Sequence, residues 1–224
     1  MDKVYLISRE DFNLIKDAEQ LIMTARIGDG HVQTQAKNSC VAYSSILQNY
    51  IQFKHDVLVA GGYACSDVKL RDNSAGYNKK GIIYYTSSHV DERINKYAQM
   101  PRIDIIKNLG YFGFLLYLFD DGAYHKAHAT MHIYCNSFNP EEVVALKQAI
   151  FKLFPIKECR DRVDKKKDGR QYPYLYVPVD TVKEIVKYYK EFVENEPLLH
   201  CMLYKLGLPS QTIKSNKCNS LTGE

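Results

Sequence analysis

The sequence predicts a mixed α/β (α+β) protein that contains one arrangement of helices and strands twice. Apolar residues at helical spacing alternate with pairs of short segments rich in β-branched and aromatic residues. The second half of the chain repeats the order of the first, and the interval from Asp29 to Ser45 equals that from Asp121 to Ser137. We therefore divide the chain into a first half, residues 1–98, and a second half, residues 99–224, each predicted to run helix, two strands, helix, two strands, helix.

Composition is that of a folded protein with a mild excess of positive charge. The 224 residues are 46% hydrophobic and 25% charged, with a net charge of +4. This balance permits a nucleic-acid partner without requiring one. The longest apolar run, 111–119, is too short to span a bilayer, and the first residues have no signal-peptide core. We expect no membrane association and an intracellular location: the cytoplasm of a bacterium or phage-infected cell, or an organelle matrix or stroma.

Cysteine spacing and short motifs exclude several other classes of protein. The six cysteines form no C-x-x-C pair, so a zinc site of the usual spacing is disfavoured, and we expect the thiols to be reduced. The chain has no phosphate-binding glycine-rich loop, no H-E-x-x-H and no G-x-S-x-G. These common enzyme classes are therefore unsupported.

Helical periodicity, caps and turn residues define the elements of each half. In the first half we expect a helix over 10–28 ended by Gly28-Asp29-Gly30, strands over 31–35 and 39–44, a helix capped by Ser45 and ended by Gly61-Gly62, strands near 63–69 and over 82–86, and a helix capped by Ser87 or Ser88. In the second half we expect a helix over 109–120, strands over 123–127 and 129–135, a helix that starts at Asn139-Pro140, a basic loop over 164–170, a strand over 174–177, and a helix capped by Asp180.

Each half has an Asp-Gly step at the end of its first helix, and here the sequence resembles a known family. The segments from Leu21 to His31 and from Phe112 to Gly122 resemble the two motifs of single-chain LAGLIDADG homing endonucleases, the second in the common Asp-Asp-Gly form. Met100-Pro101 and the ending Met202-Leu203-Tyr204-Lys205-Leu206 extend the resemblance over roughly residues 10–207.

The resemblance implies both a fold and an activity. It implies a pseudo-two-fold pair of αββαββα repeats whose antiparallel sheets form a saddle over double-stranded DNA. The implied activity is that of a monomeric, site-specific endonuclease that hydrolyses phosphodiester bonds across the minor groove, leaves 3′ overhangs and recognises a long pseudo-palindromic or asymmetric target. One alternative is a non-cleaving nucleic-acid binder, either an intron RNA maturase or a degenerate DNA-binding protein. Another is an unrelated two-repeat domain that binds protein or small molecules.

Asp29 and Asp121 are the predicted catalytic metal ligands. Carboxylates are hard oxygen ligands suited to Mg²⁺, and the negative ends of two helix dipoles also favour a cation. We expect Mg²⁺ as the cofactor, with Mn²⁺ able to replace it and Ca²⁺ binding without supporting the reaction. Gly30 and Gly122 are expected to let the chain leave each helix in a left-handed turn.

Further residues near this site are assigned by the resemblance. Gly28 and Asp120 are additional candidate metal ligands, Asp120 through its backbone carbonyl or a solvated side chain. Lys205 matches a family lysine near the active site, where an ammonium could stabilise the developing phosphorane. Its first-half partner is expected just before Met100-Pro101, and Lys96 is the candidate there.

Three positions depart from the family pattern. Arg26 occupies a normally apolar position of the first motif. Leu115 and Leu116 stand where small residues usually permit close packing, with Gly113 nearby. A shifted helix interface and a decayed enzyme both fit these departures.

The resemblance places DNA contacts on the sheets and on the loops that join their strands, because polar and basic side chains there can read base edges or bind phosphates. The candidates are Gln33, Gln35, Lys37, Lys69, Arg71, Lys79, Lys80, His125, Lys126, His128, Lys165, Lys166, Lys167 and Arg170. His125, His128 and His132 also raise the possibility of a metal site. Strand alternation puts 128 and 132 on one face and excludes 125 unless a turn intervenes, so strand or DNA-facing histidines are favoured.

Overall fold

The computed structural model describes residues 14–35, 37–72, 81–166 and 169–209. Within these residues the predicted order, helix, two strands, helix, two strands, helix, is present twice and is followed by a 3₁₀ helix. The elements of the first half are α1 (Leu14–Thr24), β1 (Gly30–Gln35), β2 (Asn38–Ser45), α2 (Gln48–Ala60), β3 (Lys69–Asp72), β4 (Ile82–Ser87) and α3 (Glu92–Gln99). The rest comprises α4 (Arg102–Lys107), α5 (Tyr111–Asp121), β5 (Gly122–His125), β6 (Thr130–Tyr134), α6 (Pro140–Leu153), β7 (Arg160–Lys165), β8 (Gln171–Val177), α7 (Val179–Asn195) and η2 (Pro197–Leu206).

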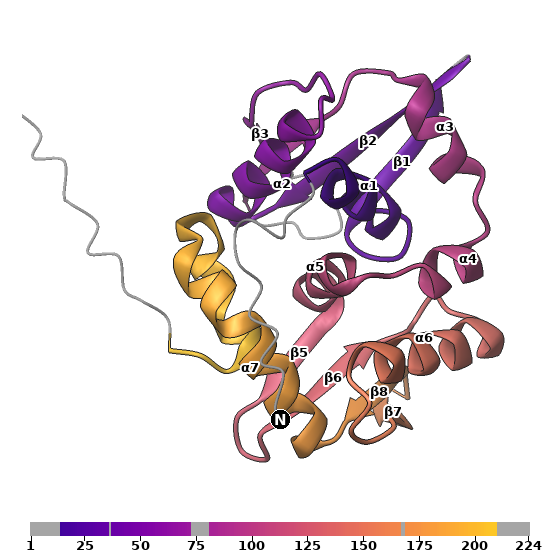
Figure 1. Ribbon diagram of the computed structural model, residues 1–224, viewed down its shortest axis with the longest axis vertical. Helices are drawn as coiled ribbons and strands as arrows, with labels where there is room; N and C mark the ends of the chain where they lie inside the picture. The colour runs from indigo at the N-terminus through magenta and orange to yellow at the C-terminus, as the bar shows by residue number, and fades with distance from the viewer. Residues whose placement is uncertain (1–13, 36, 73–80, 167–168, 210–224) are drawn as a thin grey trace, which may run out of the picture.

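Both halves build the same antiparallel sheet. The strand order is β1-β2-β4-β3 in the first half and β5-β6-β8-β7 in the second. Figure 1 shows the first half, indigo to magenta, above the second half, pink to orange. The shared strand order supports the reading of two pseudo-symmetric repeats, because two unrelated α/β units would have no reason to share it.

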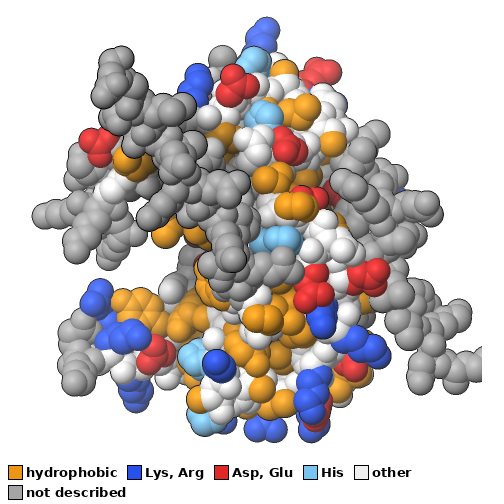
Figure 2. All heavy atoms as spheres, turned by 90° about the vertical axis from the view of Figure 1, so that its left-hand side faces the viewer, with side chains coloured by type: hydrophobic (Ala, Val, Ile, Leu, Met, Phe, Trp, Pro, Cys, Tyr) orange, Lys and Arg blue, Asp and Glu red, His pale blue; other side chains and the backbone are white. Residues whose placement is uncertain are grey.

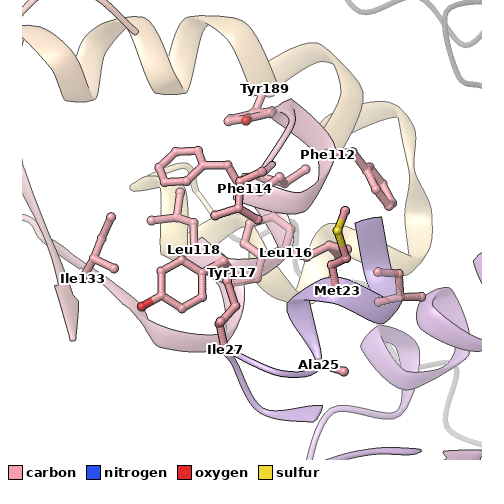
Figure 3. Close-up of a cluster of buried hydrophobic side chains, with 14 of the residues drawn as sticks. Met23, Ala25, Ile27, Phe112, Phe114, Leu116, Tyr117, Leu118, Ile133 and Tyr189 are labelled. Carbon is pink, nitrogen blue, oxygen red and sulfur yellow. The ribbon is translucent and has the colours of Figure 1, made fainter. Parts of the chain in front are cut away.

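Helices α1 and α5 pack against each other where the halves meet (Figure 1). In Figure 3, Met23 and Ile27 from the first half lie close to Phe112, Leu116 and other buried side chains of α5. Every residue of α5 from Phe112 to Phe119 is buried, so this helix is enclosed by protein on all sides. The C-terminal 3₁₀ helix η2 also crosses the boundary and packs on α2. The core is therefore continuous through both halves, and it fixes the ends of α1 and α5 relative to each other.

The helix that bears the first motif is shorter than predicted. The first predicted residues, 10–13, lie outside the described part of the chain, and α1 ends at Thr24 rather than at 28. After Thr24 the backbone tightens, because Arg26 and Ile27 donate to carbonyls three residues back. Asp29 therefore stands beyond the helix, whereas Asp121 is the last residue of α5.

The predicted start of α6 is confirmed in detail. The Asn139 side chain accepts from the Glu142 backbone N–H at 2.9 Å, and the Glu142 side chain accepts from the Asn139 N–H at 2.9 Å. Pro140 occupies the first turn, as expected.

The other predicted caps are wrong. Ser45 precedes the N-cap of α2, which is Leu47, and its hydroxyl accepts from the Leu47 N–H at 3.1 Å. α3 is capped by Asp91 instead of Ser87 or Ser88, since Ser87 still belongs to β4. Asp180 lies inside the first turn of α7, where it pairs with Lys157. Serine and aspartate accept from nearby backbone N–H groups in turns as well as at helix starts, so their presence alone does not fix the N-cap.

One predicted span and two omissions also need correction. The strand near 63–69 begins only at Lys69, and the preceding segment makes a single bridge, from Cys65 to Ser88. The predicted order requires a strand before 174–177, but no range was assigned to it. This strand is β7, and its charged sequence Arg-Asp-Arg-Val-Asp-Lys suits the exposed edge of a sheet. The short helix α4 was missed, since six residues give too little periodicity to detect. Among the described helices, none is long and apolar enough to cross a membrane.

Candidate active site and nucleic-acid interface

Asp29 and Asp121 come together at the ends of the two motif segments. The charge of Asp29 raises the pKa of Asp121, and the pKa values of both respond to the charges of Asp120, Lys54 and Lys205. Among the described residues, neither Asp29 nor Asp121 has a side-chain hydrogen-bond or ion-pair partner. The site thus brings two uncommitted carboxylates together, which is the donor set that a divalent cation requires.

Both carboxylates are harder to ionise than an ordinary aspartate. The pKa of Asp121 is raised to about 7, first by burial and then by the charges of Asp29 and Asp120. The pKa of Asp29 is raised by restricted hydration and by the charge of Asp120. Negative charge that is concentrated and poorly compensated in this way favours a bound cation. The residues present therefore fit Mg²⁺ or Mn²⁺ held by Asp29 and Asp121.

Asp120 has a different environment, and the prediction of a solvated side chain is wrong. Its side chain is 1% exposed and forms a 2.8 Å ion pair with Lys54. The same carboxylate accepts from the Tyr50 hydroxyl at 2.7 Å and from the Asp29 backbone N–H at 3.2 Å. These contacts occupy both carboxylate oxygens, so only the backbone carbonyl of Asp120 remains as a candidate metal ligand.

Lys54 and Tyr50, both on α2, are the site residues that sequence reasoning missed. The Lys54 side chain is 2% exposed, and its ammonium lies over the rings of Tyr43 and Tyr50. One signal was available in the sequence, because Lys54 falls on the apolar face of its helix beside Tyr50, Phe53 and Leu58. A lysine at a core position requires a buried partner of opposite charge, although the sequence does not identify that partner.

The two predicted lysines have unequal positions. Lys205, at the end of η2, donates to the Gly122 carbonyl at 2.7 Å and feels the charges of all three aspartates. Burial lowers the pKa of Lys205, while the aspartates act in the opposite direction. Lys96 instead forms a 2.8 Å ion pair with Glu19 on α1 and is mostly exposed. The structure thus brings Lys205, and not Lys96, to the carboxylates.

Gly30 and Gly122 were expected to adopt a left-handed turn, and this expectation is wrong. Both glycines instead allow neighbouring atoms to pack closely against the backbone. The φ angle of Gly122 is −85°, and Gly30 is not among the described residues with positive φ. A Cβ atom on Gly122 would collide with the Leu118 carbonyl oxygen, and one on Gly30 would collide with Ala25. Gly28, the other candidate ligand, faces the Asp120 side chain.

The departures from the family pattern have structural explanations. Arg26 donates from Nη1 to the carbonyls of Tyr97, Ala98 and Met100 at 2.6, 2.6 and 3.2 Å, and so holds the connection between the halves. Leu115 and Leu116 are fully buried core residues. Gly113, two residues before Leu115, lies against the Gln20 side chain of α1.

The first sheet presents a polar and basic outer face. Strand pairing places His31, Gln33 and Gln35 on the same side as Lys69 and Arg71, opposite the buried Val41 and Tyr43. Four of the predicted DNA contacts thus share one surface. Lys37 is exposed in the turn between β1 and β2. Lys79 and Lys80 lie outside the described residues.

The second sheet presents an aromatic outer face at equivalent positions. Pairing aligns Ala123, His132, Tyr176 and Arg160 across the sheet, and likewise Tyr134, Tyr174 and Arg162. The His132 ring lies 3.8 Å from that of His125 and 4.1 Å from that of Tyr174, measured between centroids. A turn between β5 and β6 allows this His–His contact, and it leaves His128 exposed in the turn. Among the described residues, no cluster of three or more potential metal ligands is found.

Basic side chains accumulate at the edge of this second sheet. Lys126 is exposed in the β5–β6 turn, and Lys165, Lys166 and Arg170 are exposed around the β7–β8 connection. Lys166 pairs with Asp164 at 2.7 Å. Lys167 lies outside the described residues. On the side of the molecule drawn in Figure 2, more Lys and Arg side chains are visible in the lower part than in the upper part.

Comparison with solved structures defines the class of fold. The homing endonuclease I-WcaI, bound to its DNA recognition sequence, matches with a TM-score of 0.66 and 16% identity over 90% of this chain and 91% of that one. A variant of I-DmoI in complex with its nicked target DNA, in the presence of 2 mM Mn, matches with a TM-score of 0.50 and 10% identity over 82% of this chain and 98% of that one. The predicted fold class is confirmed: the chain has the LAGLIDADG homing-endonuclease fold.

Comparison of the sequence alone finds no match. No known family model matches the chain, and no curated protein is significantly similar to it in sequence. At these levels of identity the structural likeness establishes the fold, and function must be argued from the site.

Proposed function

We propose that this protein is a site-specific, metal-dependent double-strand DNA endonuclease of the LAGLIDADG homing type. The observation that supports this most strongly is the pair of unpartnered carboxylates, Asp29 and Asp121, one at the end of each pseudo-symmetric motif. A fold decayed to structural use would have no need to keep two aspartates with raised pKa close together, since their repulsion costs stability.

Each residue of the site has a definable role in phosphodiester hydrolysis. Asp29 and Asp121 would hold Mg²⁺, which when bound activates water and neutralises charge on the transferring phosphate. Lys205 is the cation that can reach the scissile phosphate region, because its ammonium lies beside the residue after Asp121. Asp120 and Lys54 neutralise each other in the interior and so leave the two outer aspartates to bind the metal.

The outer faces of the two sheets would bind the DNA target. Gln33, Gln35, Lys69 and Arg71 on the first sheet carry the amide, ammonium and guanidinium groups that read base edges or bind phosphates. Histidine and tyrosine side chains occupy the second sheet at the equivalent places. Because the two faces differ chemically, we infer that the target is asymmetric rather than a perfect palindrome.

Cleavage of a randomised plasmid library tests this function. The wild-type chain is incubated with the library in Mg²⁺, and the ends produced are mapped by sequencing. The Asp29→Asn, Asp121→Asn double variant is run beside it. Asp56→Asn is the matched control, because Asp56 is an exposed aspartate on α2. An asparagine there can still accept the hydrogen bond from the Gln52 side chain.

Discrete cuts with short 3′ overhangs are expected from the wild type and from Asp56→Asn, and none from the double variant. Salt-sensitive DNA binding without cutting by the wild type would overturn the nuclease and favour the non-cleaving binder, whether of DNA or of intron RNA. Absence of any nucleic-acid affinity at low salt would exclude both.

A further inference from the structure

The ion pair between Lys54 and Asp120 breaks the pseudo-symmetry of the molecule. The residue before the first catalytic aspartate is Gly28, whereas the residue before the second is Asp120. Lys54 lies at the same interval after Asp29 as Leu146 does after Asp121, and Leu146 is fully buried. One half therefore contributes Lys54 and Gly28 where the other contributes Leu146 and Asp120. The buried charge pair has no counterpart at the symmetry-related position.

The Asp120 side chain reaches across the boundary into the first half. A Cβ atom on Gly28 would lie 2.7 Å from Asp120 Oδ2, so the glycine leaves the space that this carboxylate fills. Lys54 and Tyr50, on the far side, hold the carboxylate at 2.8 and 2.7 Å. With two donors fixing it from α2, the Asp120 carboxylate is a rigid acceptor.

That acceptor holds the backbone at Asp29. The last backbone hydrogen bond of the first motif segment runs from the Gly28 N–H to the Thr24 carbonyl, at 2.8 Å. The next amide, that of Asp29, donates to Asp120 Oδ2 at 3.2 Å. Asp121 needs no such support, because it is still part of helix α5. The two candidate metal ligands are thus held by different means.

We propose that Asp120, fixed by Lys54 and Tyr50, is a positioning residue for Asp29, and that the two strands of the DNA target are consequently nicked by sites of unequal rigidity. The inference about strand nicking rests on the proposed function. The inference that Asp120 positions Asp29 rests on the folded protein alone. Loss of the Asp120 carboxylate releases the Asp29 backbone and leaves Asp121 in place.

The chain itself suggests the variant that tests this. Lys54→Leu with Asp120→Ala removes both charges together and introduces, at position 54, the residue that the second half has at the equivalent place. Removing both avoids the uncompensated buried charge that a single substitution would leave. Arg102→Leu with Glu142→Leu is the control, because it removes an ion pair of 2.6 Å between α4 and α6, away from the carboxylates.

Amide hydrogen exchange, followed by NMR on the full chain, tests the positioning directly. In the double variant the Asp29 amide is expected to exchange at least about tenfold faster than in the wild type, as for the loss of a hydrogen bond to a charged group. The Asp121 amide should be unchanged, and the control variant should change neither selectively. Equal acceleration at both amides, or none at Asp29, overturns the proposal.

Strand-resolved nicking of the selected target tests the consequence. Asp29→Asn identifies the strand whose nicking depends most on Asp29. In Lys54→Leu, Asp120→Ala the nicking rate on that strand should fall by about tenfold or more relative to the other strand, since small misplacements cost large factors in rate. If Asp120 had only a structural role, nicking of both strands would slow alike, as we expect for the control variant. An unchanged ratio of the two nicking rates would overturn the inference about strand nicking. If the wild type nicks neither strand, the proposed function fails, while the exchange measurement still decides the role of Asp120.

Discussion

The ammonium of Lys205 lies 2.7 Å from the carbonyl oxygen of Gly122, the residue that directly follows Asp121. A residue of the last described helix is thereby attached to the end of the second motif. Its positive charge is half-buried beside three carboxylates, an arrangement in which electrostatic effects on a reacting phosphate are large.

Replacing Lys205 should impair the reaction far more than it impairs binding. For Lys205→Met we expect nicking of the target to fall by about 100-fold or more, as on removal of one preorganised charge from an active site. The dissociation constant for DNA should change by less than about threefold, because one phosphate contact at most is lost. Single-turnover nicking and filter binding measure the two quantities.

Lys96→Met is the control for that experiment. Lys96 pairs with Glu19 at an exposed position, so its loss should affect nicking only slightly. Equal effects of the two substitutions would show that the unequal placement of the two lysines has no catalytic meaning.

The raised pKa of Asp121 predicts how stability depends on pH in the absence of metal. The pKa of Asp121 is about 7 in the folded chain and lies near the ordinary aspartate value in the unfolded chain, so the folded chain binds the Asp121 proton more tightly. The free energy of unfolding therefore falls as the pH rises from the unfolded-state pKa to the folded-state pKa. Asp121→Asn should therefore melt at a higher temperature than the wild type at pH 8, by roughly 2–4 °C or more for a chain of this size. The difference should vanish at about pH 3 and below, where Asp121 is protonated in both the folded and the unfolded chain.

Thermal unfolding in EDTA across this pH range measures the effect, and Asp56→Asn should show no such trend. Added Mg²⁺ should raise the melting temperature of the wild type at pH 8 and not that of Asp121→Asn. A wild type that is the more stable of the two at pH 8 without metal would contradict the burial of this charge.

Arg26 should be important for stability rather than for catalysis. Arg26→Leu removes a donor that contacts three carbonyl oxygens between Tyr97 and Met100, and it should destabilise the fold by about 2–3 kcal/mol. Urea unfolding checks this value. Arg93→Leu, at an exposed ion pair with Asp91, should cost no more than about 1 kcal/mol. A cost within about 0.5 kcal/mol for Arg26→Leu would show that the connection between the halves does not depend on it.

The chemical difference between the two sheet faces predicts separable effects on target recognition. His132→Ala and Tyr174→Ala should relax sequence preference in one half of the target, and Gln33→Ala in the other half. Lys69→Gln and Arg71→Gln should each reduce the salt dependence of binding, by about one unit of slope per lost phosphate contact. Selection of preferred targets by each variant would show whether the changes segregate; changes spread over both halves would contradict this assignment.

The parts of the fold that sequence predicted are those that depend on local signals. Asn139-Pro140, the β-branched run of β4 and the two Asp-Gly steps each carry their information within a few residues, and the elements they imply are present. Two features were missed although their contacts are close in sequence: Asp91 caps α3 by accepting from the Arg93 N–H, and β7 forms a hairpin with β8. Serines compete with Asp91 as caps on side-chain type, and the charged sequence of β7 lacks the apolar alternation that predicts a strand.

The candidate site also contains residues that the sequence predicted and residues that it did not. Asp29 and Asp121 were identifiable because they repeat in register along the chain. The partnership of Lys54 with Asp120 joins residues that are distant in sequence and has no symmetry mate, so repeat analysis could not reveal it. The sequence showed only that a lysine occupies an apolar helix face.

The most direct test of the nuclease assignment is strand-resolved cleavage of the selected target by the Asp29→Asn and Asp121→Asn single variants and by the double variant, with DNA binding measured in parallel. We predict that each single variant is strongly impaired, that the double variant cuts neither strand, and that all three bind the target about as tightly as the wild type. Cleavage by the double variant, or a wild type that binds its target and leaves both strands intact, would contradict the assignment of these two aspartates as the metal-binding centre of a nuclease.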